Sequence, residues 1–117
     1  MREIKFRAWD GSNEMMVPWD RLGVYNAEYL ADKSDWFVMQ YTGLKDKNGV
    51  EIYEGDVVKW THGSDDTLSF VKEVMWYAER AAWGLKDHPM HYVYLFDPES
   101  HLEVIGNTYE GATPEGE

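Results

Sequence analysis

The sequence predicts an all-β protein in which an N-terminal β-hairpin subdomain is joined to a small β-barrel subdomain. Two observations support this fold class. Short apolar segments alternate with turn residues along the 117-residue chain, and aromatic residues, which favour strands, make up 15% of it. We expect one domain over residues 1–110, with subdomains of about 1–39 and 40–110, and a disordered acidic tail over 111–117.

The first expected element is a β-hairpin over residues 4–17. Apolar and charged side chains alternate strictly along its first strand, which is typical of a half-buried strand. The apolar face of that strand holds Ile4, Phe6 and Ala8, and the charged face holds Glu3, Lys5 and Arg7. Turn residues follow at 10–13, and residues 14–17 return as the partner strand before Pro18 ends it.

The middle of the chain predicts further strands and two turns. Residues 19–29 fit neither period well, and we expect a strand around Leu22–Tyr25, then a polar loop and a buried strand over Trp36–Tyr41. Asn48 and Gly49 form a pair that can adopt the positive φ angles of a two-residue hairpin turn. A second reversal is expected at Glu54-Gly55-Asp56, directly before the strand formers Val57 and Val58.

Residues 70–82 admit two interpretations. Their apolar residues fall on one helical stripe, which favours a helix, but the segment 71–77 is rich in strand-forming residues. We expect a strand over about 70–77, a turn over 78–82 and a strand through Trp83–Lys86. Strands over Tyr92–Phe96 and Leu102–Ile105 complete the prediction.

Composition indicates the cellular compartment in which we expect the protein. The chain has no cysteine, which excludes a disulfide framework, thiol catalysis and cysteine-based zinc sites, and suits a reducing cytosol. It also has no apolar run long enough for a signal peptide or a membrane span. We therefore expect a cytoplasmic protein that does not associate with a membrane.

The net charge of −11 disfavours nucleic acid as a partner. The acidity is concentrated at the C-terminal end, because residues 96–117 hold six acidic residues and no Lys or Arg. A phosphate backbone would be repelled by this field unless a basic face opposed it, and the one basic cluster consists of Arg2, Lys5 and Arg7. We expect no tight binding of DNA.

No residue pattern has the spacing of a catalytic or metal site, so we expect no catalytic residues, no cofactor and no metal. The segment Asp46–Gly49 is similar to the opening of a calcium loop, but the later oxygen ligands are replaced by apolar residues. We interpret it as a turn, in which Asp46→Ala would lower stability only modestly. An acid/base carboxylate needs apolar surroundings that raise its pKa. Glu73 and Glu103 come closest to this, and we expect both on the solvent-exposed faces of strands.

Three blocks of the sequence resemble one known family. They are Arg2–Asp10, Gln40–Val58 and Glu103–Glu110, and they occur in the order found in YopX-type proteins of bacteriophages and prophages. The resemblance implies a single YopX-like domain over 1–110 that is small and mostly β. It provides no catalytic residues to carry over. Turn chemistry, and not the resemblance, identifies Asn48, Gly49, Gly55 and Asp56 as structural turn residues.

The segment Gly55–Trp60 resembles the strand entry of SH3-like barrels, in which a tight turn leads into a long curved strand. We therefore expect the barrel subdomain to be SH3-like. In such barrels aromatic residues line a groove beside that strand, and here a possible interaction surface would hold Tyr53, Trp60, Trp76 and Trp83. The alternative interpretation is that most of these rings belong to the core.

The leading hypothesis is a non-enzymatic phage or prophage accessory protein that acts through protein–protein contacts. It would form a homo-oligomer, because the surplus of aromatic residues cannot all be buried, and could also bind a host or phage protein. The alternative is a nucleic-acid-binding protein, or a DNA mimic whose carboxylates imitate phosphates and occupy a DNA-binding partner. A small hydrolase rests only on the abundance of carboxylates.

Overall fold

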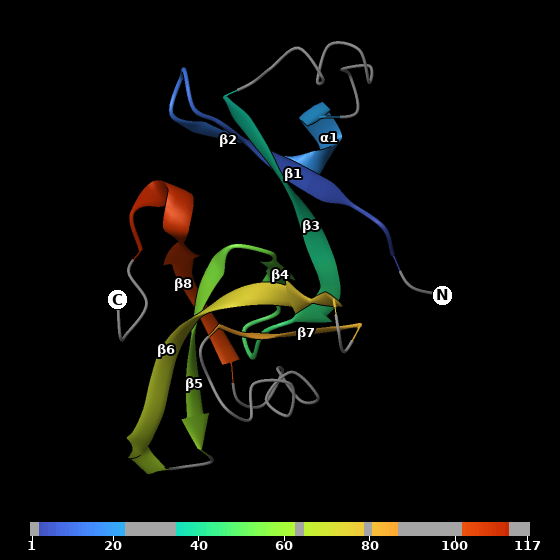
Figure 1. The fold of residues 1–117 in the computed structure, drawn as a ribbon. Coiled ribbons are helices and arrows are strands. Elements are labelled where there is room, and N and C mark those ends of the chain that lie inside the picture. Colours follow the sequence, from blue (N-terminus) through green and yellow to red (C-terminus); the bar gives the residue numbers. More distant parts are fainter. Residues whose placement is uncertain (1–2, 23–34, 63–64, 79–80, 87–101, 113–117) are drawn as a thin grey trace.

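The computed structural model describes residues 3–22, 35–62, 65–78, 81–86 and 102–112, and within these ranges eight strands form two antiparallel sheets (Figure 1). The first sheet, in the order β2-β1-β3-β4, consists of β1 (Phe6–Asp10), β2 (Met15–Val17), β3 (Trp36–Lys45) and β4 (Glu51–Tyr53). The second, in the order β7-β6-β5-β8, consists of β5 (Asp56–His62), β6 (Asp65–Tyr77), β7 (Ala82–Leu85) and β8 (Leu102–Asn107). The predicted mainly β fold class is confirmed.

The N-terminal hairpin is present, with β1 and β2 antiparallel and Ala8 opposite Val17. Its turn is closed by the Asp10 carboxylate, which accepts hydrogen bonds from the backbone N–H groups of Ser12 and Asn13. The prediction that Ile4 lies on the buried face is wrong, because its side chain is 63% exposed. The pairing of β1 with β3 begins only at Phe6, so Ile4 precedes the covered part of the sheet.

A short helix, α1 (Trp19–Leu22), follows β2 in place of the start of the expected strand. The N–H of Leu22 donates to the carbonyl of Pro18 over 2.8 Å, and the fixed φ of proline suits the first turn of a helix. Leu22 packs against Ala8 and Val17 in a small cluster of buried residues. The strand expected around Leu22–Tyr25 is therefore wrong at its first residue, and residues 23–25 lie outside the described ranges.

Strand β3 connects the upper and lower parts of the molecule in Figure 1. Residues 36–40 pair with β1, and residues 41–45 pair with β4 across an irregularity that contains Gly43, whose φ is 88°. The strand confirms the expected element and extends four residues beyond it. The expected subdomain boundary between residues 39 and 40 lies inside β3, so both parts share this strand.

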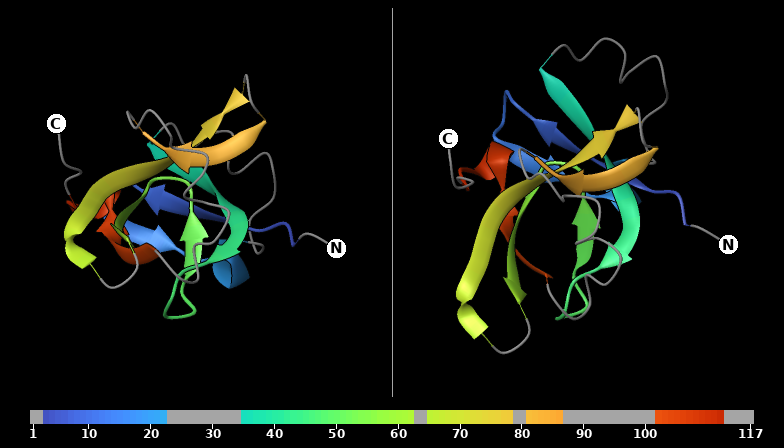
Figure 2. Two further views of the ribbon diagram at one scale, coloured as in Figure 1. Left: turned by 90° about the horizontal axis from the view of Figure 1, so that it is seen from below. Right: turned by 60° about the horizontal axis from the view of Figure 1, so that its bottom comes forward.

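The second half of β3 and strands β4–β8 curl into what we call the half-barrel (Figure 2). The core of the half-barrel is a cluster of six residues, each at most 7% exposed: Ile52, Val58, Trp60, Val74, Leu85 and Leu102. Strand β5 is central, pairing with β6 on one side and β8 on the other. The SH3-like character of this subdomain stays a prediction.

The choice between helix and strand over residues 70–77 is settled by β6, which includes all of them. After β6 the N–H of Ala81 donates to the carbonyl of Ala78, Ala81 has a positive φ of 48°, and β7 begins at Ala82, one residue before the expected start. The expected last strand is also present as β8. The strand expected over Tyr92–Phe96 and residues 113–117 of the expected tail lie outside the described ranges. The first two residues of that tail are described: Gly111 caps the 3-10 helix over Thr108–Glu110, and the N–H of Ala112 donates to the carbonyl of Asn107.

Candidate functional site

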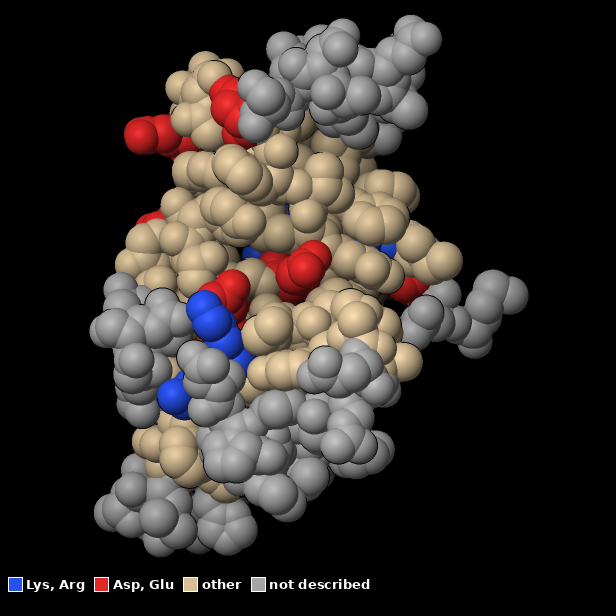
Figure 3. Space-filling view, viewed as in Figure 1, with Lys and Arg blue, Asp and Glu red and all other residues tan. Residues whose placement is uncertain are grey.

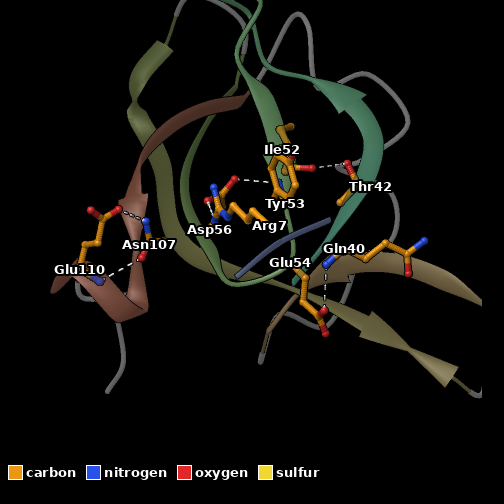
Figure 4. A network of polar contacts seen from close by, with 9 residues as sticks. All are labelled: Arg7, Gln40, Thr42, Ile52, Tyr53, Glu54, Asp56, Asn107 and Glu110. Carbon is orange, nitrogen blue, oxygen red and sulfur yellow. Dashed lines mark hydrogen bonds and ion pairs between the residues drawn. The ribbon is translucent and has the colours of Figure 1, made fainter. Parts of the chain in front are cut away.

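The turn formed by Glu54, Gly55 and Asp56 is where the three resembling sequence blocks meet (Figure 4). From β1, Nη2 of Arg7 lies 2.5 Å from Oδ1 of Asp56, while Oδ2 of Asp56 accepts the N–H of Tyr53. From the third block, the N–H of Thr108 donates to the carbonyl of Gly55. These contacts join segments far apart in the sequence, so the residues concerned hold the fold together.

Asp56 was not identified by the sequence as a carboxylate in apolar surroundings, yet it is only 1% exposed. Burial raises its pKa above the usual value of 3.8, and the nearby positive charge of Arg7 opposes that rise. Arg7 itself was expected on the wet face of its strand, but its side chain is only 15% exposed because the half-barrel covers that face. The available signal was the position of Asp56 directly before Val57 and Val58.

Asp46 is a second buried acid, also 1% exposed, and it organises the turn between β3 and β4. Its Oδ1 accepts the N–H groups of Asn48 and Val50, and its Oδ2 accepts that of Val104 in β8, 58 residues away. With both oxygens bound by backbone donors, Asp46 joins this turn to β8. The sequence led us to expect a modest effect of Asp46→Ala on stability, and these three hydrogen bonds lead us to expect a larger one.

The same turn differs from the two-residue type that the sequence predicted. Five residues, 46–50, separate the paired Lys45 and Glu51, and the N–H of Gly49 donates to the carbonyl of Asp46. Gly49 has the expected positive φ, at 80°, but Asn48 does not have one. The Asp46 hydrogen bonds favour this wider loop, because they require the chain to wrap around the carboxylate.

Two members of the expected basic cluster are paired with carboxylates. Nζ of Lys5 lies 2.5 Å from Glu51, and this hydrogen bond raises the pKa of Lys5. Arg7 is paired with Asp56, and its guanidinium also lies 4.5 Å from the centre of the Tyr53 ring. Their charges are therefore used inside the protein, while Arg2 lies outside the described ranges.

The four aromatic residues of the predicted interaction surface do not form one groove. Tyr53 and Trp60 are each only 7% exposed, and Trp60 stacks on Phe70 inside the half-barrel. This part of the prediction is wrong, because Trp60 belongs to the core cluster of the half-barrel and Tyr53 is buried against Tyr41 and Arg7. The alternative interpretation, that such rings belong to the core, holds for both.

Trp76 and Trp83 are brought together as directly opposed residues of β6 and β7. Their ring centres are 5.1 Å apart and their planes meet at 66°, an edge-to-face arrangement. Together with Gln40 and Glu54 they line a cavity of about 270 Å³, which we call the Trp76 cavity. Trp76 is 41% exposed, so this pair is an accessible aromatic surface.

A second, wider cavity of about 410 Å³ lies near the 3-10 helix η3 (Thr108–Glu110) and is lined by Trp9, Glu14, Tyr109, Glu110 and Gly111. Tyr109 stacks on Phe37 at 5.5 Å and on Trp9 at 6.3 Å. Burial raises the pKa of Tyr109, and the charges of Glu54 and Glu73 raise it further. Tyr109 therefore packs the end of the half-barrel against Trp9 and Phe37 of the first sheet, near the carboxylates of Glu54 and Glu73.

The described lining residues of the two cavities are suited to binding. Neither set contains a serine, threonine, cysteine or lysine that could act as a nucleophile, and the described part of the chain holds no group of three or more potential metal ligands. Figure 3 shows acidic side chains near the middle of one face of the molecule.

Among the described residues, no helix has the length and apolar character needed to span a bilayer.

Comparison with known proteins identifies a family and a structural neighbour. The family model described as YopX protein matches residues 23–114. The crystal structure of protein EF1440 from Enterococcus faecalis is 26% identical in sequence, with a TM-score of 0.63, and the match covers 94% of this chain and 96% of that one. Comparison with curated proteins finds no match.

Proposed function

The chain belongs to the YopX protein family, and we propose that it is a non-enzymatic phage or prophage accessory protein that works by binding another protein. The observation that carries this proposal is the accessible pair Trp76 and Trp83 beside its cavity. Tryptophan is enriched among the residues that contribute most binding energy at protein interfaces. At about 270 Å³ the cavity lies below the usual range for drug-sized ligands, and its size suits a side chain of a partner.

The alternative of a nucleic-acid-binding protein has less support. Lys5 and Arg7 are held against Glu51 and Asp56, so a phosphate would have to compete with partners already 2.5 Å away. The net charge of −11 adds long-range repulsion. A DNA mimic would use the acidic surface alone, whereas the proposal assigns the contact to aromatic rings.

We also propose that the protein self-associates. Strand β2 is at an edge of the first sheet. Exposed apolar side chains occur on β2 itself at Met15 and on β3 at Phe37 and Val38, each between 41% and 52% exposed. Light scattering should give a mass that is a multiple of 13.7 kDa at micromolar concentration. A monomer mass across that range would refute self-association without affecting the proposed binding surface.

The proposed function is tested by capture of a partner from lysate of the host bacterium, followed by reconstitution with the purified partner. Trp76→Ala should weaken the reconstituted complex about tenfold, the scale of a strong interface residue. Trp19→Ala is the matched control, because Trp19 is similarly exposed, at 43%, but lies on α1. If Trp19→Ala weakens the complex as much, or if DNA binds with a sub-micromolar Kd, the proposal is wrong.

A further inference from the structure

We infer that the Trp76 cavity accepts a cationic side chain, lysine or arginine, from a protein partner. This inference rests on the proposed function and specifies the chemistry of the contact. It follows from three features: the arrangement of the two indole rings, the carboxylate of Glu54 that has no cation partner among the described residues, and the negative net charge of the protein.

The two indole rings form two walls that meet at an angle. Trp76 and Trp83 are edge to face, at 66° and 5.1 Å, so a group entering beside them can contact the face of one ring and the edge of the other. The faces of aromatic rings attract cations, and tryptophan does so most strongly. An ammonium or guanidinium group on a flexible stem therefore fits these walls in both chemistry and size.

Glu54 supplies the negative charge. Among the described residues its carboxylate accepts one long hydrogen bond, 3.4 Å from the N–H of Gln40, and it forms no ion pair. Glu51 and Asp56, its neighbours in sequence, are both paired with cations at 2.5 Å. Glu54 is thus a carboxylate facing an aromatic cavity without a cation of its own, as Figure 4 shows for its position beside Gln40.

The other classes of occupant fit less well. An anion would meet the Glu54 carboxylate in a protein whose net charge is already −11. A purely apolar group would remove water from that carboxylate and give it no partner, which costs free energy. A cation satisfies Glu54 and the indole faces together, and the acidic field of the protein attracts it from a distance.

The test uses the full chain and three blocked glycine-rich peptides that differ at one position: lysine, arginine or norleucine. Binding is followed by the indole N–H signals in NMR spectra. The lysine and arginine peptides should bind with a Kd of roughly millimolar order and shift the Trp76 signal, and the norleucine peptide should bind about tenfold more weakly. Equal binding of the norleucine peptide would overturn the inference.

Two charge variants make the test specific. Glu54→Gln should weaken the lysine peptide about fivefold, while Glu14→Gln, which removes the same charge at the other cavity, should leave its binding unchanged within twofold. Equal weakening by both variants would mean that only the overall field matters, and would overturn the inference. Trp76→Ala serves as the aromatic variant, because Trp83 packs against the core and could affect folding.

The inference and the proposed function can fail separately. If a protein partner requires Trp76 but the cationic peptides do not bind, the occupant is not a cation and the proposed function stands. If the cationic peptides bind as expected but no protein partner depends on Trp76, the cation site stands and the proposed function fails.

Discussion

The hairpin layer, made of β1, β2, α1 and the first half of β3, differs from the half-barrel in how much apolar surface it buries. The buried cluster of the hairpin layer has three members, Ala8, Val17 and Leu22. The cluster of the half-barrel has six, among them the large side chains of Trp60 and Leu102. A core as small as that of the hairpin layer does not stabilise a hairpin on its own.

The hairpin layer is therefore stabilised by its contacts with the half-barrel. Arg7 reaches Asp56, and Tyr109 stacks on Trp9 and Phe37. The comparison indicates that the half-barrel is the more stable region, and that a buried ion pair and a few rings fix the hairpin layer against it in addition to the shared strand β3. Each prediction below tests a part of this difference.

Arg7→Met should have the largest effect, because it leaves the Asp56 carboxylate buried without a cation. We expect the free energy of unfolding at neutral pH to fall by about 3–5 kcal/mol, measured by urea denaturation. Lys5→Met is the control. Glu51, the partner of Lys5, is more exposed than Asp56, so water can hydrogen-bond to its carboxylate after the substitution. The loss in free energy of unfolding should therefore be much smaller than for Arg7→Met. Equal effects of the two variants would mean that the pair joining the two regions has no special role.

The loss in free energy of unfolding caused by Arg7→Met should also depend on pH. Burial raises the pKa of Asp56, so the folded state binds this proton more tightly than the unfolded state does. Stability from this group is present below the usual value of 3.8 and is lost as pH rises through the folded-state pKa. Without Arg7 the pKa of Asp56 in the folded state should rise further. The loss of stability caused by Arg7→Met should therefore become smaller as the pH falls toward the usual value of 3.8. A pH-independent deficit would contradict this account.

Asp46→Ala should have the next largest effect, inside the half-barrel. It removes the acceptor of three backbone hydrogen bonds and leaves the N–H groups of Asn48, Val50 and Val104 without their partner. We expect a loss of about 3 kcal/mol in urea denaturation. Asp46→Asn, which keeps one acceptor oxygen, should recover part of it, and Asp20→Ala on α1 should stay within about 0.5 kcal/mol. A loss under 1 kcal/mol for Asp46→Ala would refute its central role.

Gly49→Val should cost about 1–2 kcal/mol through backbone strain alone. The φ of Gly49 is 80°, a conformation that β-branched residues avoid, but a Cβ there would meet no atom within 4 Å. Gly49→Asn should therefore be milder, because asparagine tolerates this conformation. Thermal melting of the wild type, Gly49→Val, Gly49→Asn and Asp46→Ala, each with and without calcium, tests the interpretation as a turn. A calcium-dependent rise in the melting temperature of the wild type that Asp46→Ala abolishes would instead identify a metal site.

Asp10→Asn should have the smallest effect, and mainly on the pH profile. Hydrogen bonds from Asn13 and Ser12 lower the pKa of Asp10, so its stabilising contribution is present above the usual value of 3.8 and is lost as pH falls through the folded-state pKa. Removing the charge should flatten the acid side of the melting-temperature profile. An unchanged acid side would show that the hairpin turn does not depend on this charge.

The sequence determined the local elements of this protein. The alternation of residues 3–9, the apolar run from Trp36 and the strand formers of residues 71–77 each predicted a strand that is present, although the first of these strands begins only at Phe6. The three resembling blocks also predicted the family correctly. Local patterns succeed here because alternating apolar residues and β-branched or aromatic side chains suit a pleated, half-buried strand.

The tertiary structure decided which faces are covered, and therefore where a site can be. Alternation placed Arg7 on a wet face, but the half-barrel covers it, and its partner Asp56 is 49 residues away. Four rings were equivalent in the sequence, yet Tyr53 and Trp60 are in the interior while Trp76 lies at an accessible cavity. The physical reason is that burial depends on packing between distant segments, and a single sequence records the residues but not which segments meet.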